Sequence, residues 1–387
     1  MELQYITPDF QDKLLAAAHH IHRNPELSEQ EFMTTGYILD VLESLNIELT
    51  EVQPNTGVIG LIRGSKPGPT VALRADIDAL PVEEAADHAI RSEKPGVMHA
   101  CGHDTHTAAL LGAAMALSAN KEQLKGNILL IFQPAEECTT GAQAVMDTGV
   151  FKEYKPAAFL SLHVMPSIPE GKVGVRTGPI MAAQKGFDIT VTGKGGHGAS
   201  PHLAVDPVIA AARIAETLQA LPAQWANPID PFVLTVCSIH SGTTFNIIPD
   251  TANLLGTCRF LLPEYDQAVE DRIVGIADAV ALAHGCAAQT AFFRRLPPLV
   301  NDAAVAAVAT KAAEELYGKE NLVVQDMMMG SEDFALYSQI APTFMYHVGI
   351  GGPVGLHNCN ILVPEHVIVE AAELLTRAAI TALEESV

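Results

Sequence analysis

The sequence lacks several features that would assign it to a well-defined class of protein. No run approaches the ~18 consecutive apolar residues of a membrane-spanning helix, and residues 1–13 lack the basic start and apolar run of a signal peptide. Basic residues are few: 23 Lys and Arg stand against 45 Asp and Glu, so the formal net charge is −22. Nucleic acids and anionic membranes bind clustered basic residues, so neither is expected as a partner.

Cysteine is scarce too, and the six cysteines show neither disulfide-scaffold spacing nor a Cys-x-x-Cys pair. In a large chain without a secretion signal, such cysteines are mostly buried and reduced, or they serve as ligands or nucleophiles. The sequence therefore predicts a cytoplasmic protein. Internal repeats and low-complexity tracts are absent, and hydrophobic residues make up 48% of the chain, which indicates a globular protein throughout.

Hydrophobic periodicity predicts alternating helices and strands in the first part of the chain. Helical spacing occurs over residues 14–22, 32–45 and 107–118. Short strands are expected at 57–62 and 70–74, with a Gly-Pro turn at 66–69 between them, and continuous apolar strands at 127–132 and 157–162. Alternation of this kind is typical of an α/β domain with a mixed, mostly parallel sheet and helices on both faces.

The pattern changes near residue 185 and returns after Pro297-Pro298. The intervening order is strand, helix, strand, strand, helix, strand, which matches the split βαβ unit, with these elements at 186–193, 207–221, 232–239, 251–260, 265–284 and 287–294. The alternation of helices and strands seen in the first part of the chain then resumes, with helices at 303–316 and 365–383 and a strand at 343–347. We predict a larger α/β domain, residues 1–183 and 297–387, interrupted by an α+β domain, residues 184–296.

Polar side chains follow three of the predicted strands. Asp76 and Asp78 come after one strand, Glu136 and Glu137 after the next, and His163 closes a third. Ligands of open α/β sheets bind beyond the carboxyl ends of the strands. The sequence therefore predicts that these groups meet at one edge of the sheet.

A thiol and three imidazoles occur within residues 99–106, His-Ala-Cys-Gly-His-Asp-Thr-His. Gly102 permits a tight turn, so Cys101 and His103 can face one metal ion. Zinc-type ions accept thiolate, imidazole and carboxylate together, and a mixed set with a spare acid points to a catalytic site rather than a structural one. Of Glu136 and Glu137, one can bind metal while the other handles a proton, although an exposed acidic turn is the alternative.

Six motifs in order give the chain a family resemblance. It resembles the amidohydrolase branch of the aminoacylase and carboxypeptidase metallopeptidases (peptidase family M20, clan MH), which includes hippurate hydrolases, N-acetyldiaminopimelate deacetylases and plant auxin-conjugate hydrolases. The motifs are His22-Arg23-Asn24-Pro25-Glu26-Leu27, Leu73-Arg74-Ala75-Asp76-Ile77-Asp78-Ala79-Leu80-Pro81, Met98-His99-Ala100-Cys101-Gly102-His103-Asp104, Phe132-Gln133-Pro134-Ala135-Glu136-Glu137, Gly195-Gly196-His197-Gly198-Ala199-Ser200-Pro201-His202 and Gly330-Ser331-Glu332-Asp333-Phe334.

The resemblance implies a dinuclear metallopeptidase catalytic domain that holds two divalent ions, zinc or manganese. It implies five metal ligands, Cys101, His103, Glu137, His163 and His357. In this resemblance Cys101 would bridge the two ions, and Asp78 would orient a ligand by hydrogen bonding to it. The resemblance further implies that Glu136 is the general base, which would deprotonate the water bridging the metals and then protonate the leaving amine.

The same resemblance makes the inserted domain a lid and dimerisation domain. His197 then stabilises the oxyanion, often from a partner subunit, while Asn246 and Arg259 hold the substrate carboxylate. Taken alone, a histidine such as His197 in a Gly-rich turn is more often a plain loop residue, and Arg259 could equally pair with a structural acid. A homodimer or higher homo-oligomer is expected. His19, His20 and His22 fit exposed or satisfied histidines better than ligands.

The expected activity is hydrolysis of the amide bond in N-acyl amino acids, with acetyl, benzoyl or similar acyl groups. A metal-dependent dipeptidase or carboxypeptidase would use the same fold and site. A thiol enzyme with Cys101 as nucleophile leaves Glu136, Glu137 and His357 without a purpose. A non-catalytic binding protein would not need Glu136.

Overall fold

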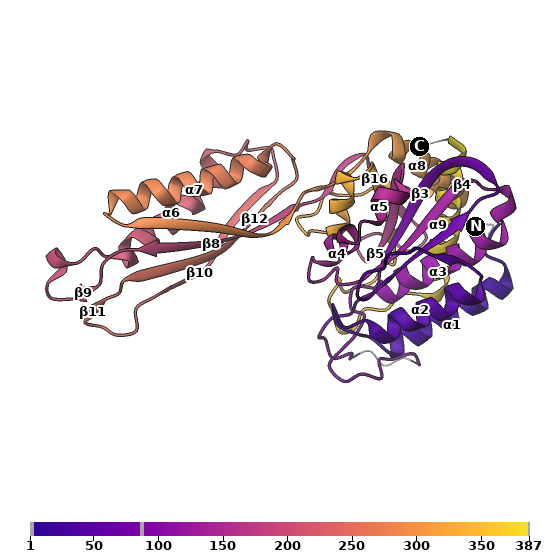
Figure 1. Ribbon diagram of the computed structural model, residues 1–387, viewed down its shortest axis with the longest axis horizontal. Coiled ribbons are helices and arrows are strands. Elements are labelled where there is room, and N and C mark those ends of the chain that lie inside the picture. The colour runs from indigo at the N-terminus through magenta and orange to yellow at the C-terminus, as the bar shows by residue number, and fades with distance from the viewer. Residues whose placement is uncertain (1–3, 86–88, 386–387) are drawn as a thin grey trace. The chain divides into compact units, whose positions relative to one another are not determined.

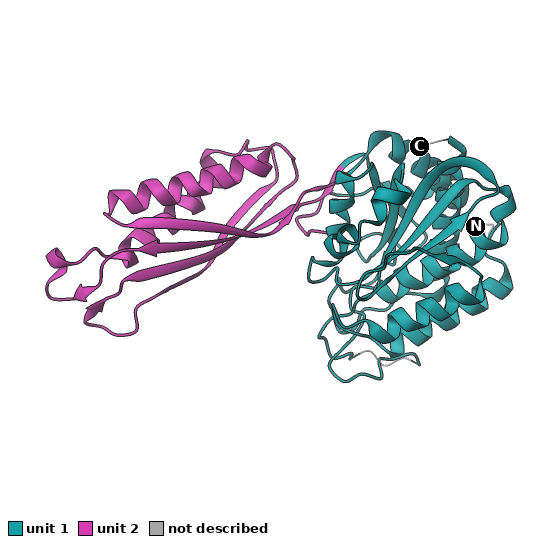
Figure 2. Ribbon diagram, viewed as in Figure 1, with its two compact units in different colours: residues 1–178, 300–326, 333–387 teal, residues 179–299, 327–332 magenta. Residues whose placement is uncertain are grey.

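The computed structural model describes residues 4–85 and 89–385, and the chain divides into two compact units (Figure 2). Unit 1 comprises residues 1–178, 300–326 and 333–387, and unit 2 comprises residues 179–299 and 327–332. The sequence pattern places the boundaries at 183/184 and 296/297 instead, and it gives no sign that residues 327–332 belong with unit 2.

Unit 1 is built on an eight-stranded sheet with the order β1-β2-β4-β3-β5-β16-β6-β15 within the described residues. The strands are β1 (Glu48–Leu49), β2 (Val58–Arg63), β3 (Lys66–Asp76), β4 (Lys125–Gln133), β5 (Ala158–Met165), β6 (Val173–Val175), β15 (Leu322–Val324) and β16 (Thr343–Gly349). The central strands β4, β3, β5 and β16 run parallel, whereas β1 and β2 are antiparallel additions at one edge. The sheet is therefore mixed with a parallel centre, which confirms the predicted fold class.

Helices cover both faces of this sheet, as Figure 1 shows. The helices α3 and α9 pack on one face and against each other, α1 packs on α3, and α8 packs on α9. On the other face, Phe151 of α5 packs edge-on against Phe159 of β5, with ring centroids 5.2 Å apart. The helices of unit 1 are α1 (Pro8–Arg23), α2 (Phe32–Ser44), α3 (His103–Ala119), α4 (Gly141–Asp147), α5 (Val150–Tyr154), α8 (Ala303–Tyr317) and α9 (Glu365–Glu385), with short 3-10 turns η1 (Lys121–Gln123), η3 (Lys319–Asn321) and η4 (Asp333–Gln339).

Local chemistry explains where the helices begin and why the central strands lie inside. Thr7 caps α1 by accepting a hydrogen bond from the amide of Phe10, and Pro8 occupies the first turn, where no amide donor is needed. Every residue of β5 is buried, as expected of a strand covered on both faces. Among the described residues, no helix is long and apolar enough to span a membrane.

Two of the sequence-based predictions for unit 1 were wrong in detail. The Gly-Pro segment 66–69 is not a turn but the start of β3, because proline is compatible with extended backbone where no ladder amide is required. A register irregularity between Lys66 and Thr70 accommodates it. Helix α3 begins at His103, earlier than residue 107, so part of the cysteine–histidine segment is helical.

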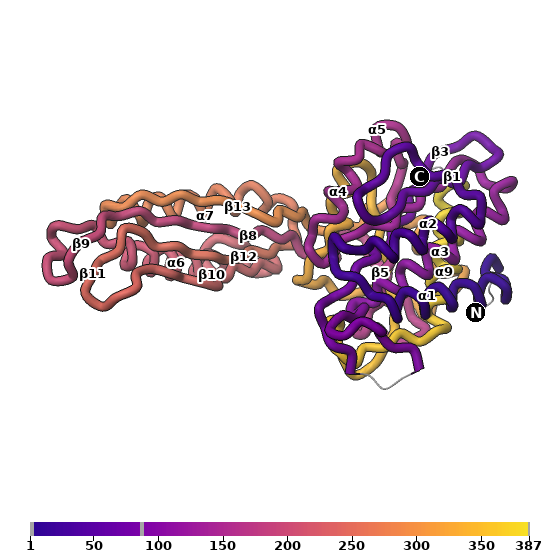
Figure 3. Tube along the Cα trace, turned by 60° about the horizontal axis from the view of Figure 1, so that its bottom comes forward, coloured from indigo at the N-terminus to yellow at the C-terminus, as the bar shows by residue number. Residues whose placement is uncertain are grey.

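Unit 2 has an antiparallel sheet with the order β10-β12-β8-β13 and two helices (Figure 3). Its elements are β7 (Gly178–Met181), β8 (Ala183–Thr192), β9 (Gly196–His197), η2 (Pro201–Leu203), α6 (Pro207–Gln224), β10 (Phe232–Ser241), β11 (Ile247–Ile248), β12 (Thr251–Phe260), α7 (Tyr265–Ala283) and β13 (Ala287–Leu296). The short strand β14 (Leu299–Asn301) begins in unit 2 and ends in unit 1. Helices α6 and α7 pack on the sheet over a separate hydrophobic core that includes Phe187, Ile214, Leu254 and Ile273. The main strands and helices follow the predicted order, strand-helix-strand-strand-helix-strand.

Candidate metal centre

The turn before α3 brings Cys101 and His103 to the end of β5. Gly102 has φ +84°, a left-handed conformation that favours glycine, and α3 begins at the next residue. Cys101 Sγ lies 3.5 Å from Nε2 of His163, which is in β5. Cys101, His103 and His163 each offer one donor atom, and these three atoms lie within 4.8 Å of one another.

A second group shares Cys101 and adds Glu137 and His357. Their donor atoms also lie within 4.8 Å of one another, as do those of His103, Glu136 and Glu137. The amide of His357 donates to the carbonyl of Ala100 at 2.7 Å, which ties the C-terminal loop to the cysteine segment. The structure thus brings the five predicted ligands and Glu136 together within unit 1. These six side chains form the donor cluster: Cys101, His103, Glu136, Glu137, His163 and His357.

Asp78 contacts the ring of His103 on the Nδ1 side. Nδ1 of His103 lies 3.0 Å from the carbonyl oxygen and 3.1 Å from Oδ1 of Asp78, so Nδ1 carries the proton. The other carboxylate oxygen of Asp78 accepts hydrogen bonds from the Ser28 hydroxyl and the amide of Glu137. Nε2 of His103 therefore presents a lone pair to the donor cluster.

The donor cluster fits a divalent cation. Nε2 of His103 is buried and has no hydrogen-bond partner among the described residues, whereas Oε1 of Glu137 lies 3.3 Å from Nε2 of His357. An unpaired buried polar atom is costly, and a metal ion would satisfy Nε2 of His103 and balance the charge of Glu137. Thiolate, imidazole and carboxylate together match the ligands of zinc-type ions.

The electrostatics favour a cation over a reactive thiol. Burial raises the pKa of the Cys101 thiol, whereas nucleophilic cysteines have a lowered pKa. Hydrogen bonds with Cys101 and Glu137 raise the pKa of His357 to about 10. This donor cluster therefore attracts positive charge, which is what a metal-binding site requires.

A buried charge network lies behind the cluster and was not predicted from the sequence. The Arg74 guanidinium donates to Gln133 at 2.9 Å, to Asp76 at 2.7 Å and to Asp333 at 3.0 Å. Asp76 also accepts from Nδ1 of His106 at 2.6 Å. All of these side chains are buried, so removing one partner would leave an uncompensated charge in the interior.

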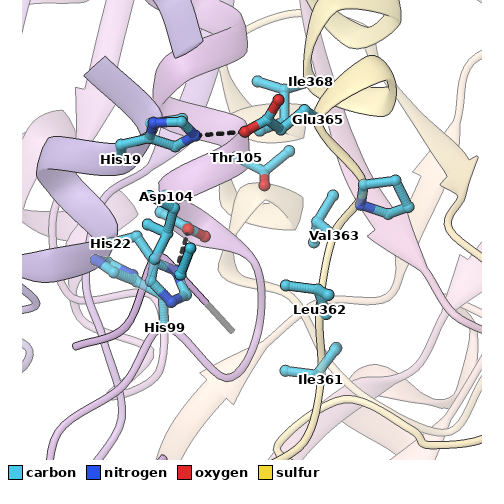
Figure 4. Close-up of a pocket in the computed structure, with 14 residues that line it drawn as sticks. His19, His22, His99, Asp104, Thr105, Ile361, Leu362, Val363, Glu365 and Ile368 are labelled. Atoms are coloured by element: carbon cyan, nitrogen blue, oxygen red, sulfur yellow. Dashed lines mark hydrogen bonds and ion pairs between the residues drawn. The ribbon is translucent and has the colours of Figure 1, made fainter. Parts of the chain in front are cut away.

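A cavity of about 280 Å³ lies between α1, the start of α3 and the segment before α9, and none of the five predicted ligands lines it (Figure 4). One wall is apolar, formed by Ile361, Leu362 and Val363. On the other wall, Nδ1 of His22 lies 2.7 Å from Asp104. Burial alone would lower the pKa of His22, but the hydrogen bond and charge of Asp104, with the charge of Glu84, raise it to about 9. His22 is thus a satisfied histidine, as expected.

The remaining predicted site residues lie in unit 2. His197 is exposed in β9, which pairs with β11, and its Nδ1 accepts from the amide of Ala199 at 3.0 Å. Asn246 is exposed beside β11. Arg259 of β12 is half-buried and donates to the hydroxyl of Ser331. Within the described part of the chain, Arg259 forms no ion pair with an acid, so its charge remains available to an anion.

Comparison with known proteins agrees with this geometry. The model of peptidase family M20/M25/M40 matches residues 72–381. The chain is 37% identical to an N-acetylcysteine deacetylase of Bacillus subtilis, over 97% of this chain and 98% of the relative. It is 40% identical to a thermostable carboxypeptidase of Saccharolobus solfataricus, over 88% of this chain and 86% of that one.

A solved structure supports the same assignment. The crystal structure of a dinuclear metal-binding M20 peptidase from Bacillus subtilis superimposes with a TM-score of 0.86 at 36% identity, covering 98% of this chain and 99% of the other. Members of this family are hydrolases that act on amide or peptide bonds. The chain belongs to peptidase family M20/M25/M40, and it is an enzyme of that hydrolase class.

Proposed function

We propose that this protein is a metal-dependent amidohydrolase that removes the acyl group from N-acyl amino acids. The observation that carries the proposal is the convergence of Cys101, His103, Glu137, His163 and His357 in unit 1, with Glu136 among them. A relative named as a deacetylase of an N-acetylated amino acid, aligned over nearly the whole chain, supports the substrate class.

The five ligands would hold two divalent ions, with Cys101 shared because its sulfur belongs to both donor groups. A thiolate favours zinc over harder ions, and manganese is the other candidate. When bound, the two ions polarise the scissile carbonyl and make water a nucleophile near neutral pH. A cation would also hold the buried Cys101 as thiolate, which its raised pKa otherwise disfavours.

The residues of this chain then supply positioning and proton transfer. Glu136 is buried at the end of β4 and shares a donor group with His103 and Glu137. In our proposal its carboxylate takes the proton of the attacking water and returns it to the leaving amine. Asp78 keeps the His103 ring in the tautomer that leaves Nε2 free.

Unit 2 would act as the lid and dimerisation domain. Arg259 would bind the carboxylate of the amino acid, because it is half-buried and has no acidic partner among the described residues. Asn246 would assist it, and His197 would stabilise the oxyanion. A cytoplasmic homodimer, or a higher homo-oligomer, is part of the proposal.

A carboxypeptidase or dipeptidase activity on short peptides is the second candidate, favoured by the relative named as a carboxypeptidase. A panel of acetyl-, benzoyl- and longer-acyl amino acids, with dipeptides, separates the two. Each substrate is incubated with enzyme before and after chelation, and again after zinc or manganese is restored. Cleavage that resists chelation would overturn the two-metal mechanism, and cleavage confined to dipeptides would replace the first proposal with the second.

The role of Glu136 is tested by Glu136→Gln, with Glu137→Gln as the matched control. We expect Glu136→Gln to keep its metal content while kcat falls by at least about 100-fold, the usual contribution of general acid–base catalysis. Glu137→Gln should lose metal instead, since it replaces a ligand. Full activity in Glu136→Gln would exclude it as the base.

A further inference from the structure

The end of β5 extends beyond its pairing with β3. The β3–β5 ladder ends at Arg74 and Ser161, two residues before His163, while β16 continues beside β5 as far as Met165. The backbone groups of Val164 on the β3 side therefore need partners other than a strand.

Two imidazoles supply these partners. The amide of Val164 donates to Nε2 of His106 at 2.9 Å. The carbonyl of Val164 lies 2.7 Å from Nδ1 of His163, which donates to it. One peptide segment is thus held between the ring of a candidate ligand and a histidine on α3.

The tautomers follow from the chemistry of the partners. A backbone amide can only donate, so Nε2 of His106 is the acceptor and its proton lies on Nδ1. Nδ1 then donates to Oδ1 of Asp76 at 2.6 Å, and Arg74 holds the other oxygen of that carboxylate. A backbone carbonyl can only accept, so His163 carries its proton on Nδ1 and leaves the Nε2 lone pair toward Cys101.

Packing adds to the hydrogen bonds. The His106 ring lies edge-on to that of His163, with centroids 4.6 Å apart, and its centroid is 5.4 Å from that of His103. His106 and His103 are three residues apart on α3, a spacing that places both on one side of the helix. His106 therefore contacts two candidate ligands but is in neither of the donor groups that include Cys101.

We propose that His106 is a positioning residue that fixes the orientation of the His163 ring through the backbone of Val164, supported by Asp76 and Arg74. The inference rests on the proposed function, because it assumes that His163 binds metal. Losing an outer partner of a metal ligand typically lowers metal affinity by about 10- to 100-fold. Because His106 acts through one intervening residue, Val164, we expect the low end of this range, about 10-fold.

The test compares three variants. His106→Leu removes both hydrogen bonds, and His106→Gln retains one acceptor and one donor. His347→Leu is the matched control, because His347 is a buried histidine on β16 whose Nε2 has no partner among the described residues. It lies beside His163 in the ladder without bonding to the Val164 peptide.

Three readouts are used, none of which needs turnover. Zinc affinity is measured by chelator competition, and the cobalt(II)-substituted protein gives an absorption spectrum that reports ligand geometry. Hydrogen exchange at the Val164 amide is measured in metal-free protein. We expect His106→Leu to weaken zinc binding about 10-fold, alter the cobalt spectrum and speed the exchange. His106→Gln should restore all three, and His347→Leu should leave them unchanged.

An equal effect of His106→Leu and His347→Leu would overturn the proposal, since it would indicate general loss of packing. Unaltered zinc affinity and cobalt spectrum in His106→Leu would overturn it as well. His163→Ala separates this failure from failure of the proposed function. If His163→Ala keeps full zinc content, His163 is not a ligand and the metal assignment itself fails; if it loses zinc while His106→Leu does not, only the positioning role fails.

Discussion

Replacing His22 by glutamine should make the stability of unit 1 less dependent on pH. The His22 side chain is 12% exposed and Asp104 is 11% exposed, so solvent screens their interaction weakly. The pKa of His22 is about 9 in the folded protein, against the ordinary 6.5. At 1.36 kcal/mol per pH unit, protonated His22 contributes about 3 kcal/mol to folding.

The direction of this pH dependence follows from the linkage between proton binding and folding. Because the folded state binds the proton more tightly, the contribution is fully present below pH 6.5 and is lost as the pH rises through about 9. Asp104 has its pKa lowered to about 2; burial alone would raise it, but the hydrogen bond and charge of His22 outweigh that. The pKa shifts of His22 and Asp104 report one and the same interaction, so their contributions to the folding free energy are not added.

The assay is urea unfolding of metal-free wild type and His22→Gln, followed by circular dichroism at about pH 6 and about pH 10. The difference in unfolding free energy between wild type and His22→Gln should fall by about 3 kcal/mol from the lower to the higher pH. His19→Gln is the control, because His19 pairs with an exposed glutamate, Glu365, and such pairs contribute about 1 kcal/mol or less. A difference between wild type and His22→Gln that does not change with pH would refute the reasoning.

Two further substitutions test the support of the metal centre. Arg74→Met leaves the buried carboxylates behind the site without their cation and should cost about 3–5 kcal/mol of folding free energy in thermal or urea unfolding. Arg63→Met breaks only an exposed pair and should cost about 1 kcal/mol or less; equal losses would contradict the role of the network. Gly102→Ala places a Cβ 2.5 Å from the Val164 side chain at φ +84°, so it should lower zinc affinity in a chelator competition. Gly171→Ala, at φ +77° with nothing within 4 Å, shares only the backbone strain and should leave zinc affinity unchanged; a fall in both would point to a general effect.

The parts of the fold and site that depend on local sequence could be predicted. The continuous apolar runs of β4 and β5 identify buried strands, and the polar groups that follow them, Glu137 and His163, reach one edge of the sheet because parallel strands share that edge. The tight turn between Cys101 and His103 could also be predicted, because glycine adopts the left-handed conformation of Gly102 more readily than other residues.

What could not be predicted depends on register and on contacts between distant residues. The Arg74–Asp333 pair joins residues 259 positions apart. The partnership of His106 with Val164 exists because the β3–β5 ladder stops at Ser161, and no pattern in the sequence marks where pairing ends. The short helices α4 and α5 are also absent from the prediction, because five to seven residues carry too little periodicity to detect.

The position of unit 2 within the chain sets an order for biosynthesis. Its sheet and both helices are complete at residue 296, before β16 and α9 have been made. Unit 1 still lacks β16, which lies beside β5, and α9, which packs on α3. Domains fold as units as they emerge from the ribosome, so we expect unit 2 to fold first, although its sequence lies in the middle. His357, which would complete the donor cluster, is synthesised after the sheet and helices of unit 2, so in our proposal metal loading follows the folding of unit 2.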